Sequence, residues 1–319
     1  MRGLLNWQNQ RESFIKNFRE SIDKHSVEKD VDKTEKNFQE SLSGIENLSK
    51  LRPATYLLDR DLISNKKLAS ILLILTLDFK GDLNLILTTR SKNLRSHPGE
   101  TALPGGRVDL TDDSIISAAF REANEEIGLP IDDFNKFTYL TTLEPFVSRY
   151  LLIVYPVICL YHELNSDLIP KLSANQQEVS EIFSIPLKLI LNSELKPSED
   201  DQLDRSAQQA NSSVKGKRNG NDNDNIRPIY SFEDFASFNN TTYRHHSFQH
   251  PTMPSRLSGL TADVVLTTLV TAYQLELDNL SFGSISATGQ VARKTLVEWV
   301  LSGQISPGGD RQDLVINKK

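Results

Sequence analysis

Three glutamates close together in this sequence are the residues whose types and spacing could do chemistry. Glu122, Glu125 and Glu126 lie at positions i, i+3 and i+4, so a helix would place all three carboxylates on one face. Three like charges on one patch cost stability, and hard divalent cations with a preference for oxygen ligands are the usual reason to accept that cost. The alternative is an ordinary solvated acidic helix face, and the glutamates alone do not decide between the two.

The helix that would carry these glutamates has clear predicted ends. We expect it to begin at about Ser114 and to stop at Gly128, because glycine is a good C-terminal breaker and Pro130 follows it. A Pro-Gly-Gly turn ending in Gly105 and Gly106 precedes the helix. Two glycines in a turn let backbone amides approach phosphate oxygens closely. This stretch therefore predicts a glycine turn followed by a carboxylate-bearing helix.

The same stretch resembles the Nudix box, whose pattern is G-x5-E-x7-R-E-U-x-E-E-x-G-U, with U an aliphatic residue. The second half, from Arg121 to Leu129, fits at every fixed position, with Ala123 in an aliphatic position. The first half departs from the pattern. Asp113 takes the first acidic position, and the expected glycine falls on Arg107, one residue after Gly106.

Two further signatures accompany the box. The upstream one resembles the segment L-x-x-R-S-x3-R-x3-G-x3-F-P-G-G that marks the coenzyme A-cleaving branch of the Nudix hydrolases. Its matching residues are Leu87, Arg90, Ser91, Arg95, Gly99, Pro104, Gly105 and Gly106, with Leu103 where the pattern prefers phenylalanine. Downstream, Gly259 to Ala262 is similar to the branch's Gly-Leu-Thr-Ala element. Three signatures in this order favour the metal-binding interpretation over the solvated acidic face.

The resemblance implies the fold and the metal. It covers roughly residues 51–280 and implies an α/β (α+β) Nudix fold, a mixed β-sheet sandwiched between helices with a loop-helix-loop metal site. Mg²⁺ or Mn²⁺ held by Glu122, Glu125 and Glu126 would neutralise a diphosphate and lower the pKa of a bound water. Glu125 and Glu126 are the first candidates for the base. Arg121 is expected to orient the glutamates by ion pairing.

Other residues are expected to bind substrate or to assist the metal site. Arg90, Arg95, Gly105 and Gly106 are the predicted phosphate contacts, since guanidinium groups suit phosphate oxygens. Asp113 and Glu178 are additional candidates. Glu178 resembles the carboxylate of a family Glu-Val element that joins the metal site or serves as base, and its alternative is a surface carboxylate. His97 is interpreted as an ordinary loop histidine.

The resemblance also implies a reaction. It is hydrolysis of the pyrophosphate bond of coenzyme A and its derivatives, giving phosphopantetheine and adenosine 3′,5′-bisphosphate. One alternative uses the same chemistry on oxidised or ordinary nucleoside triphosphates or other nucleotide diphosphate compounds. Another is a Nudix-like module that binds a nucleotide without cutting it, although the complete glutamate set argues against that. Peroxisomal location is expected from the resemblance, with cytoplasm or mitochondrion as intracellular alternatives.

The rest of the chain suggests three parts. Residues 1–50 form a predicted helical extension, 51–280 the hydrolase domain with a disordered polar insert at 196–228, and 281–319 a helical tail. Apolar residues three and four apart predict two amphipathic helices in the extension, which we expect to pack on their own domain. They are Phe14, Ile15, Phe18 and Ile22, then Phe38, Leu42 and Ile45. We expect a hairpin at 68–77 and 83–89, strands at 139–143 and 149–160, and helices at 261–277 and 291–301.

Composition excludes several function classes. The net charge of −6 gives no general attraction to nucleic acid or to acidic membranes. A small-molecule partner, coenzyme A or a derivative, is what the resemblance implies. Cys159 is the single cysteine, which excludes an internal disulfide and a cysteine-based zinc site. No apolar run is long enough for a membrane span. His245, His246 and His250 have a metal-like spacing, but we expect no metal site in what appears as a Pro- and Ser-rich loop.

Overall fold

The main sheet is mixed, as predicted. The computed structural model describes residues 5–25, 31–55, 58–65, 67–132, 134–195, 227–236, 241–276, 286, 290–302, 304 and 315–318. Its strands here are β1 (Leu5–Asn6), β2 (Leu68–Leu77), β3 (Leu83–Arg90), β4 (Thr101–Ala102), β5 (Gly105–Arg107), β6 (Phe137–Thr142), β7 (Phe146–Val147), β8 (Ile153–Leu164) and β9 (Val179–Pro186). The order is β1-β6-β8-β2-β3-β4, with β5 beside β2, β7 beside β8 and β9 beside β3.

The predicted hairpin forms the centre of this sheet. β2 and β3 are antiparallel, while β2 and β8 are parallel. The predicted strand at 149–160 begins only at Ile153, because Ser148 and Leu152 close a turn with a 2.9 Å backbone hydrogen bond. Successive β2 residues serve opposite faces. Leu72 and Ile74 belong to one hydrophobic core, and Leu73 and Leu75 belong to the other.

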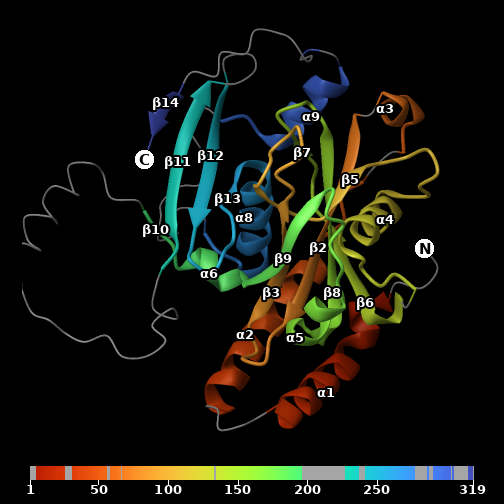
Figure 1. Cartoon of the computed structure of the whole chain (residues 1–319), viewed down its shortest axis with the longest axis vertical. Helices are drawn as coiled ribbons and strands as arrows, with labels where there is room; N and C mark the ends of the chain where they lie inside the picture. The colour runs from red at the N-terminus through yellow and green to blue at the C-terminus, as the bar shows by residue number, and fades with distance from the viewer. Residues whose placement is uncertain are drawn as a thin grey trace, which may run out of the picture.

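Helix α4 (Ile115–Ile127) covers the first face of the sheet and carries the three glutamates (Figure 1). It begins and ends as expected. Ser114 is its N-cap and accepts a hydrogen bond from the Ser117 amide, and Gly128 closes it in the left-handed conformation with φ of 62°. Its apolar face, which includes Phe120 and Ala123, is fully buried against the sheet. The glutamates are therefore carried by a helix whose apolar face is packed against the sheet.

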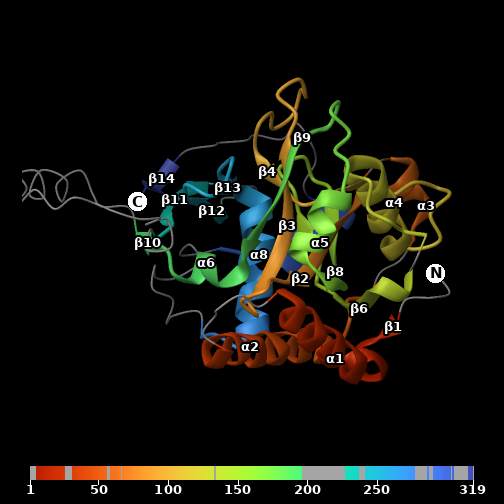
Figure 2. The ribbon, with the colours of Figure 1, turned by 60° about the horizontal axis from the view of Figure 1, so that its bottom comes forward.

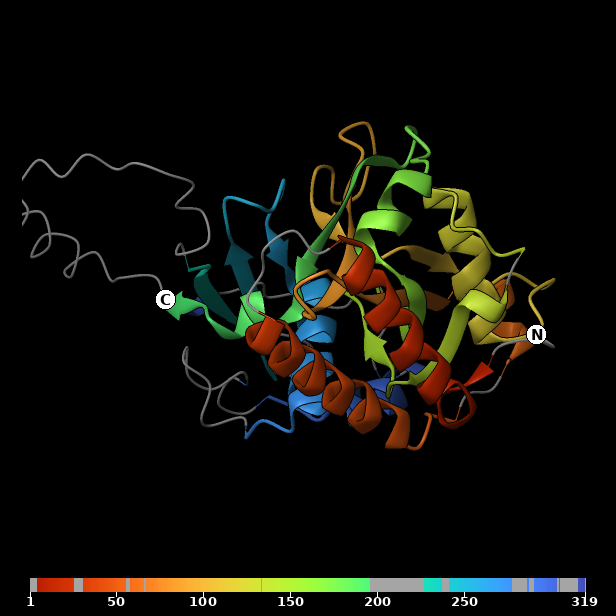
Figure 3. The same ribbon diagram turned by 90° about the horizontal axis from the view of Figure 1, so that it is seen from below.

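Two long helices at the start of the chain, where the sequence predicts two amphipathic helices, cover the other face. α1 (Trp7–His25) and α2 (Val31–Lys50) run beneath the sheet (Figures 2 and 3). Their buried residues share one core with β2 and β3, and they are Trp7, Phe14, Phe18, Phe38, Leu42, Ile45 and Leu48. Within the described residues, every helix is too short or too polar to cross a membrane.

A second, smaller sheet lies beyond α8 (Gly259–Tyr273), which packs between the two sheets (Figure 1). Its described strands are β10 (Glu194–Leu195), β11 (Ile229–Ala236), β12 (Thr242–Gln249), β13 (Leu257–Ser258) and β14 (Val315–Lys318). The loop prediction around His245 and His246 was therefore wrong. Both lie on β12, where alternate residues face opposite sides and Phe248 is fully buried.

The last part of the chain also differs from its prediction. The expected helix is α9 (Arg293–Leu301), but the tail ends in β14, which pairs antiparallel with β11. Of the predicted insert at 196–228, residues 196–226 lie outside the described part of the chain. Short helices complete the architecture: α3 (Arg60–Ser64), α5 (Asn165–Leu168), α6 (Leu187–Leu191), and the 3₁₀ helices Phe134–Lys136 and Ile169–Lys171.

Gly81, in the turn between β2 and β3, fixes how α2 meets the sheet. Its φ is +79°, and an added Cβ would lie 2.6 Å from the Thr34 carbonyl oxygen and 2.8 Å from the Phe38 amide nitrogen. The Ser41 hydroxyl donates a 2.7 Å hydrogen bond to the Gly81 carbonyl. Helix and turn thus approach closely because the turn has no side chain.

We predict that Gly81→Ala lowers the free energy of unfolding by about 2–5 kcal/mol, since it adds backbone strain and overlap with the α2 backbone. Gly99→Ala is the matched control. Its φ is +73°, yet its nearest neighbour would be Lys92 Cγ at 3.9 Å, so only the strain of about 1–2 kcal/mol applies. Urea denaturation measures both. Equal losses would show that α2 is not held against this turn.

Candidate functional site

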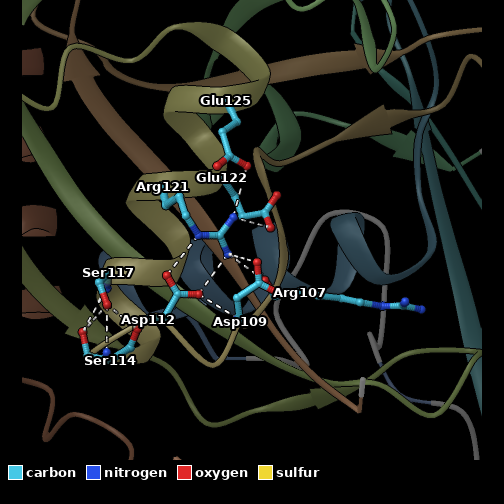
Figure 4. Close-up of polar contacts among 8 residues, drawn as sticks. All are labelled: Arg107, Asp109, Asp112, Ser114, Ser117, Arg121, Glu122 and Glu125. Carbon is cyan, nitrogen blue, oxygen red and sulfur yellow. Dashed lines mark hydrogen bonds and ion pairs between the residues drawn. The ribbon is translucent and has the colours of Figure 1, made fainter. Parts of the chain in front are cut away.

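Arg121 binds the acidic residues of the site together (Figure 4). Its Nη1 lies 3.0 Å from Glu122 Oε1 and 3.1 Å from Glu125 Oε2. Its Nε and Nη2 donate to the two oxygens of Asp112 at 3.0 and 2.9 Å, and Nη2 also donates to the Arg107 carbonyl. The hydrogen bonds to Asp112 and Glu122 raise the pKa of Arg121. Arg121 therefore pairs with Glu122 and Glu125, and its expected role in orienting the glutamates stays a prediction.

Glu126 is the most deeply placed of the three glutamates. It is 8% exposed, and its Oε2 accepts a 3.0 Å hydrogen bond from the Gly105 amide. The pKa of Glu126 is raised to about 7, chiefly by burial and also by the charges of Glu122 and Glu178, while the Gly105 hydrogen bond and the Arg90 charge oppose the rise. The Gly105 amide was predicted to approach phosphate, but in this structure it positions Glu126.

Glu122 lies directly against the glycine turn. A Cβ on Gly106 would lie 2.4 Å from Glu122 Oε2, so any larger residue here would displace this carboxylate. Burial raises the pKa of Glu122, opposed by Arg121 and assisted by the charges of Glu125 and Glu178. Glu125 is the most accessible of the three, with 54% of its side chain exposed. The three carboxylates thus occupy different depths on one helix face.

Glu178, from the loop before β9, is brought to the α4 glutamates. Its charge raises the pKa values of both Glu122 and Glu126, so it lies within electrostatic reach of them, although 56 residues of sequence separate it from Glu122. Its side chain is exposed. Glu122 and Glu126 thus lie against the Gly105–Gly106 turn, and Glu178, from a second segment, lies within electrostatic reach of both.

The predicted arginines lie at the end of β3. Arg90 is half-buried and acts on Glu126 through its charge. Its Nε donates to the Ser96 carbonyl at 3.4 Å. Arg95 is exposed in the loop that joins β3 to β4. The structure thus brings Arg90 to the glutamates and leaves Arg95 on the surrounding loop.

Asp112 was missed by sequence reasoning. Its side chain is 5% exposed and forms the paired contact with Arg121, whereas Asp113, the residue assigned to the first acidic position, is exposed. The signal was present in the sequence, because the first half of the box is shifted by one residue. Reading the shift as a change in loop length would have allowed either aspartate.

The family comparison agrees with this geometry. A model of the NUDIX domain matches residues 66–206. The chain contains a Nudix domain. Nudix hydrolase 15, mitochondrial, of Arabidopsis thaliana is 42% identical over 135 residues, which cover 42% of this chain and 45% of that protein. Peroxisomal coenzyme A diphosphatase 1 of Saccharomyces cerevisiae is 35% identical over 142 residues, covering 38% and 42%.

A solved structure of a Nudix hydrolase from M. smegmatis, RenU, aligns over 48% of this chain and 91% of that chain, with 20% identity and a TM-score of 0.32. The similarity to the two curated relatives spans less than half of their length. What the comparisons share with the structure is the Nudix domain itself, with its mixed sheet and flanking helices.

Nudix domains generally use a divalent cation, and the donor set of this one suits it. Carboxylate oxygens are the ligands that Mg²⁺ and Mn²⁺ prefer, and a cation would relieve the burial and repulsion that raise the pKa values of Glu122 and Glu126. In the described part of the chain, no group of three or more acidic, histidine or cysteine side chains is arranged to bind an ion. In this structure Arg121 bonds to Glu122 and Glu125, and the Gly105 amide bonds to Glu126.

His246, on β12, and His250, directly after β12, each form a hydrogen bond with another side chain. His246 is buried and forms a 2.9 Å hydrogen bond with the Tyr230 hydroxyl, and His250 forms one of 2.7 Å with Thr252. Neither histidine belongs to a metal-binding group within the described residues.

The two glycines of the Nudix domain's turn should respond differently to alanine. Gly105 has φ of +146°, and its Cβ would meet backbone atoms, the Ser70 oxygen at 2.4 Å and Ile71 Cα at 2.5 Å. We predict that Gly105→Ala lowers the free energy of unfolding by about 2–5 kcal/mol. Gly106→Ala should cost at most about 1.5 kcal/mol, because it displaces only the end of the Glu122 side chain and its hydrogen bond. Urea denaturation measures both, and the reverse order would contradict the arrangement of this turn.

Proposed function

We propose that this protein hydrolyses the pyrophosphate bond of coenzyme A and its derivatives, using a divalent cation. The observation that carries the proposal is the carboxylate cluster of α4, in which Glu122 and Glu126 lie against the Gly105–Gly106 turn and Arg121 joins Glu125 to Glu122. The charge of Glu178 also acts on Glu122 and Glu126. Carboxylate oxygens bind hard divalent cations, and a bound cation would neutralise the negative charge of a diphosphate. The proposal extends the Nudix domain's general chemistry to one substrate.

Glu122, Glu125 and Glu126 would hold Mg²⁺ or Mn²⁺, which when bound supplies charge neutralisation of the diphosphate and a water of lowered pKa. Arg121 keeps Glu122 and Glu125 oriented and balances part of their charge, while the Gly105 amide positions Glu126. Arg90 places a positive charge beside Glu126, where it neutralises charge on a phosphoryl oxygen. Glu125 or Glu126 accepts the proton of the attacking water.

The reaction is an in-line substitution at phosphorus. A water oxygen bonds to one phosphorus atom of the diphosphate, the bond from that phosphorus to the bridging oxygen breaks, and the second phosphate leaves with the bridging oxygen. The products are phosphopantetheine and adenosine 3′,5′-bisphosphate. Catalysis comes from positioning and from charge stabilisation rather than from a covalent intermediate.

The choice of coenzyme A is supported by the loop that follows β3. Its residues Arg90, Ser91, Arg95 and Gly99 match the coenzyme A-associated signature, and the loop begins beside the glutamates through Arg90. The yeast relative named as a coenzyme A diphosphatase adds to this support. A nucleoside triphosphate or a dinucleotide would use the same carboxylates without needing this loop.

We predict that the purified full chain releases phosphopantetheine and adenosine 3′,5′-bisphosphate from coenzyme A only when Mg²⁺ or Mn²⁺ is present. Glu125→Gln should lower turnover by about 10²–10⁴, the range for loss of a general base. Glu181→Gln, an exposed carboxylate on β9, is the control and should match the wild type. Product chromatography on coenzyme A, an oxidised nucleoside triphosphate and a dinucleotide measures all three proteins.

Three outcomes would contradict the proposal. Faster release from the triphosphate or the dinucleotide would keep the carboxylate site but reject coenzyme A as the substrate. Wild-type turnover by a folded Glu125→Gln variant, or no product from any compound, would reject the assignment of the reaction centre and favour a domain that only binds nucleotides.

A further inference from the structure

An aromatic contact joins two loops at the end of the sheet where the glutamates lie. Loop 91–100 connects β3 to β4, and turn 148–152 connects β7 to β8. The rings of His97 and Tyr150 meet edge to face across them, with centroids 6.0 Å apart and planes at 73°. Tyr150 is 52% exposed, among the most exposed of the large apolar side chains. The pair therefore presents aromatic surface to solvent.

The backbone holds Tyr150 in place. Ser148 closes its turn, because the Ser148 hydroxyl accepts hydrogen bonds from the Tyr150 and Leu152 amides at 3.3 and 3.0 Å. The next residue, Leu151, has φ of +59° although it is not glycine, and its side chain is buried. A leucine rarely adopts this conformation, and buried packing is what maintains it. Backbone strain of this kind gathers at ligand-binding sites.

The backbone and side chain of His97 are also constrained. It also has a positive φ, 52°, and its Nδ1 lies 2.9 Å from Glu100 Oε2. The base of its loop is closed by two backbone hydrogen bonds between Arg90 and the residues Gly99 and Glu100, at 3.1 and 2.9 Å. A single exposed tyrosine needs no explanation. Two rings in contact, each on a constrained backbone, indicate a built surface.

Strand register places this surface near the glutamates. Ser70 on β2 pairs with Gly106 on β5 at one side and with Tyr155 on β8 at the other. Gly106 and Tyr155 therefore lie at the same height along the strands, about two strand spacings or 10 Å apart. Tyr150 precedes Tyr155 by five residues, which is at most about 17 Å along the strand. On the opposite side, Arg90 connects Glu126 to the same loop through the Ser96 carbonyl.

We propose that His97 and Tyr150 form a stacking platform for the planar base of the substrate's nucleotide, which is adenine in coenzyme A. The proposal rests on the proposed function. A diphosphate at the glutamates leaves its nucleoside free to extend toward the two loops. Aromatic rings stack on any base through its flat face, and a constrained ring loses little entropy on binding.

The test separates the two halves of coenzyme A. Calorimetry would measure the binding of adenosine 3′,5′-bisphosphate and of phosphopantetheine to the full chain. Tyr150→Ala should weaken binding of the adenine-containing half by about 5- to 150-fold, the range for one stacked base, and leave the other half unchanged. Tyr150→Phe keeps the ring and should stay within about threefold of wild type. Ile229→Ala, an equally exposed side chain on β11, is the matched control and should bind both halves as wild type does.

Three results would overturn the platform: no binding of adenosine 3′,5′-bisphosphate by the wild type, no change in Tyr150→Ala, or equal loss of both halves, which would indicate a structural effect. Coenzyme A hydrolysis by the wild type is measured in parallel. A wild type that binds the adenine half through Tyr150 but releases no product supports the platform and contradicts the proposed hydrolase function.

Discussion

The site depends on how the negative charge of α4 is balanced. Arg121 forms hydrogen-bonded ion pairs with Asp112, Glu122 and Glu125 at 2.9–3.1 Å. Part-buried carboxylates of like charge need such a countercharge, since removing one partner leaves the others uncompensated. The same guanidinium ties the loop before α4 to the helix through the Arg107 carbonyl. One side chain therefore sets both the charge balance of the site and the position of its loop.

The remainder of the fold supports this cluster. Gly105 and Gly106 bring β5 close enough for one amide to bond to Glu126 and for Glu122 to lie against the turn. The C-terminal part of the chain contributes as well. The Ser255 hydroxyl lies 3.1 Å from Thr89 Oγ1 on β3 and 2.7 Å from Thr101 Oγ1 on β4. Both ends of loop 91–100 are thus fixed by a segment more than 150 residues away.

The sequence predicted the parts of the site that obey local rules. The start of α4 at Ser114, its end at Gly128 and the common face of its three glutamates follow from capping preferences and helical periodicity. Residues brought together by tertiary packing were harder. Asp112 replaced Asp113 as the partner of Arg121 because loop length, not spacing, decides which aspartate faces the helix. The strand at His245 was missed because its partner, β11, follows a long polar segment.

The His97–Tyr150 contact is another pair of residues that tertiary packing brings together. Neither residue carries a signal of its own, and 53 positions separate them, yet the order of β3, β2 and β8 in the sheet brings their loops to one end. The sequence marked Glu178 through its resemblance to a family element, but only the fold shows that it acts on Glu122 and Glu126. Chemistry that depends on sheet order is not visible in sequence spacing.

The central claim is that the α4 carboxylates bind a divalent cation, in competition with Arg121 and the Gly105 amide. Electron paramagnetic resonance of Mn²⁺ titrated into the full chain tests it most directly, because bound and free Mn²⁺ have different signals. We predict that the wild type and Glu298→Gln, an exposed carboxylate on α9, bind Mn²⁺ alike, while Glu126→Gln binds it at least about tenfold more weakly. Equal affinity in all three proteins, or no binding by the wild type, would contradict the account.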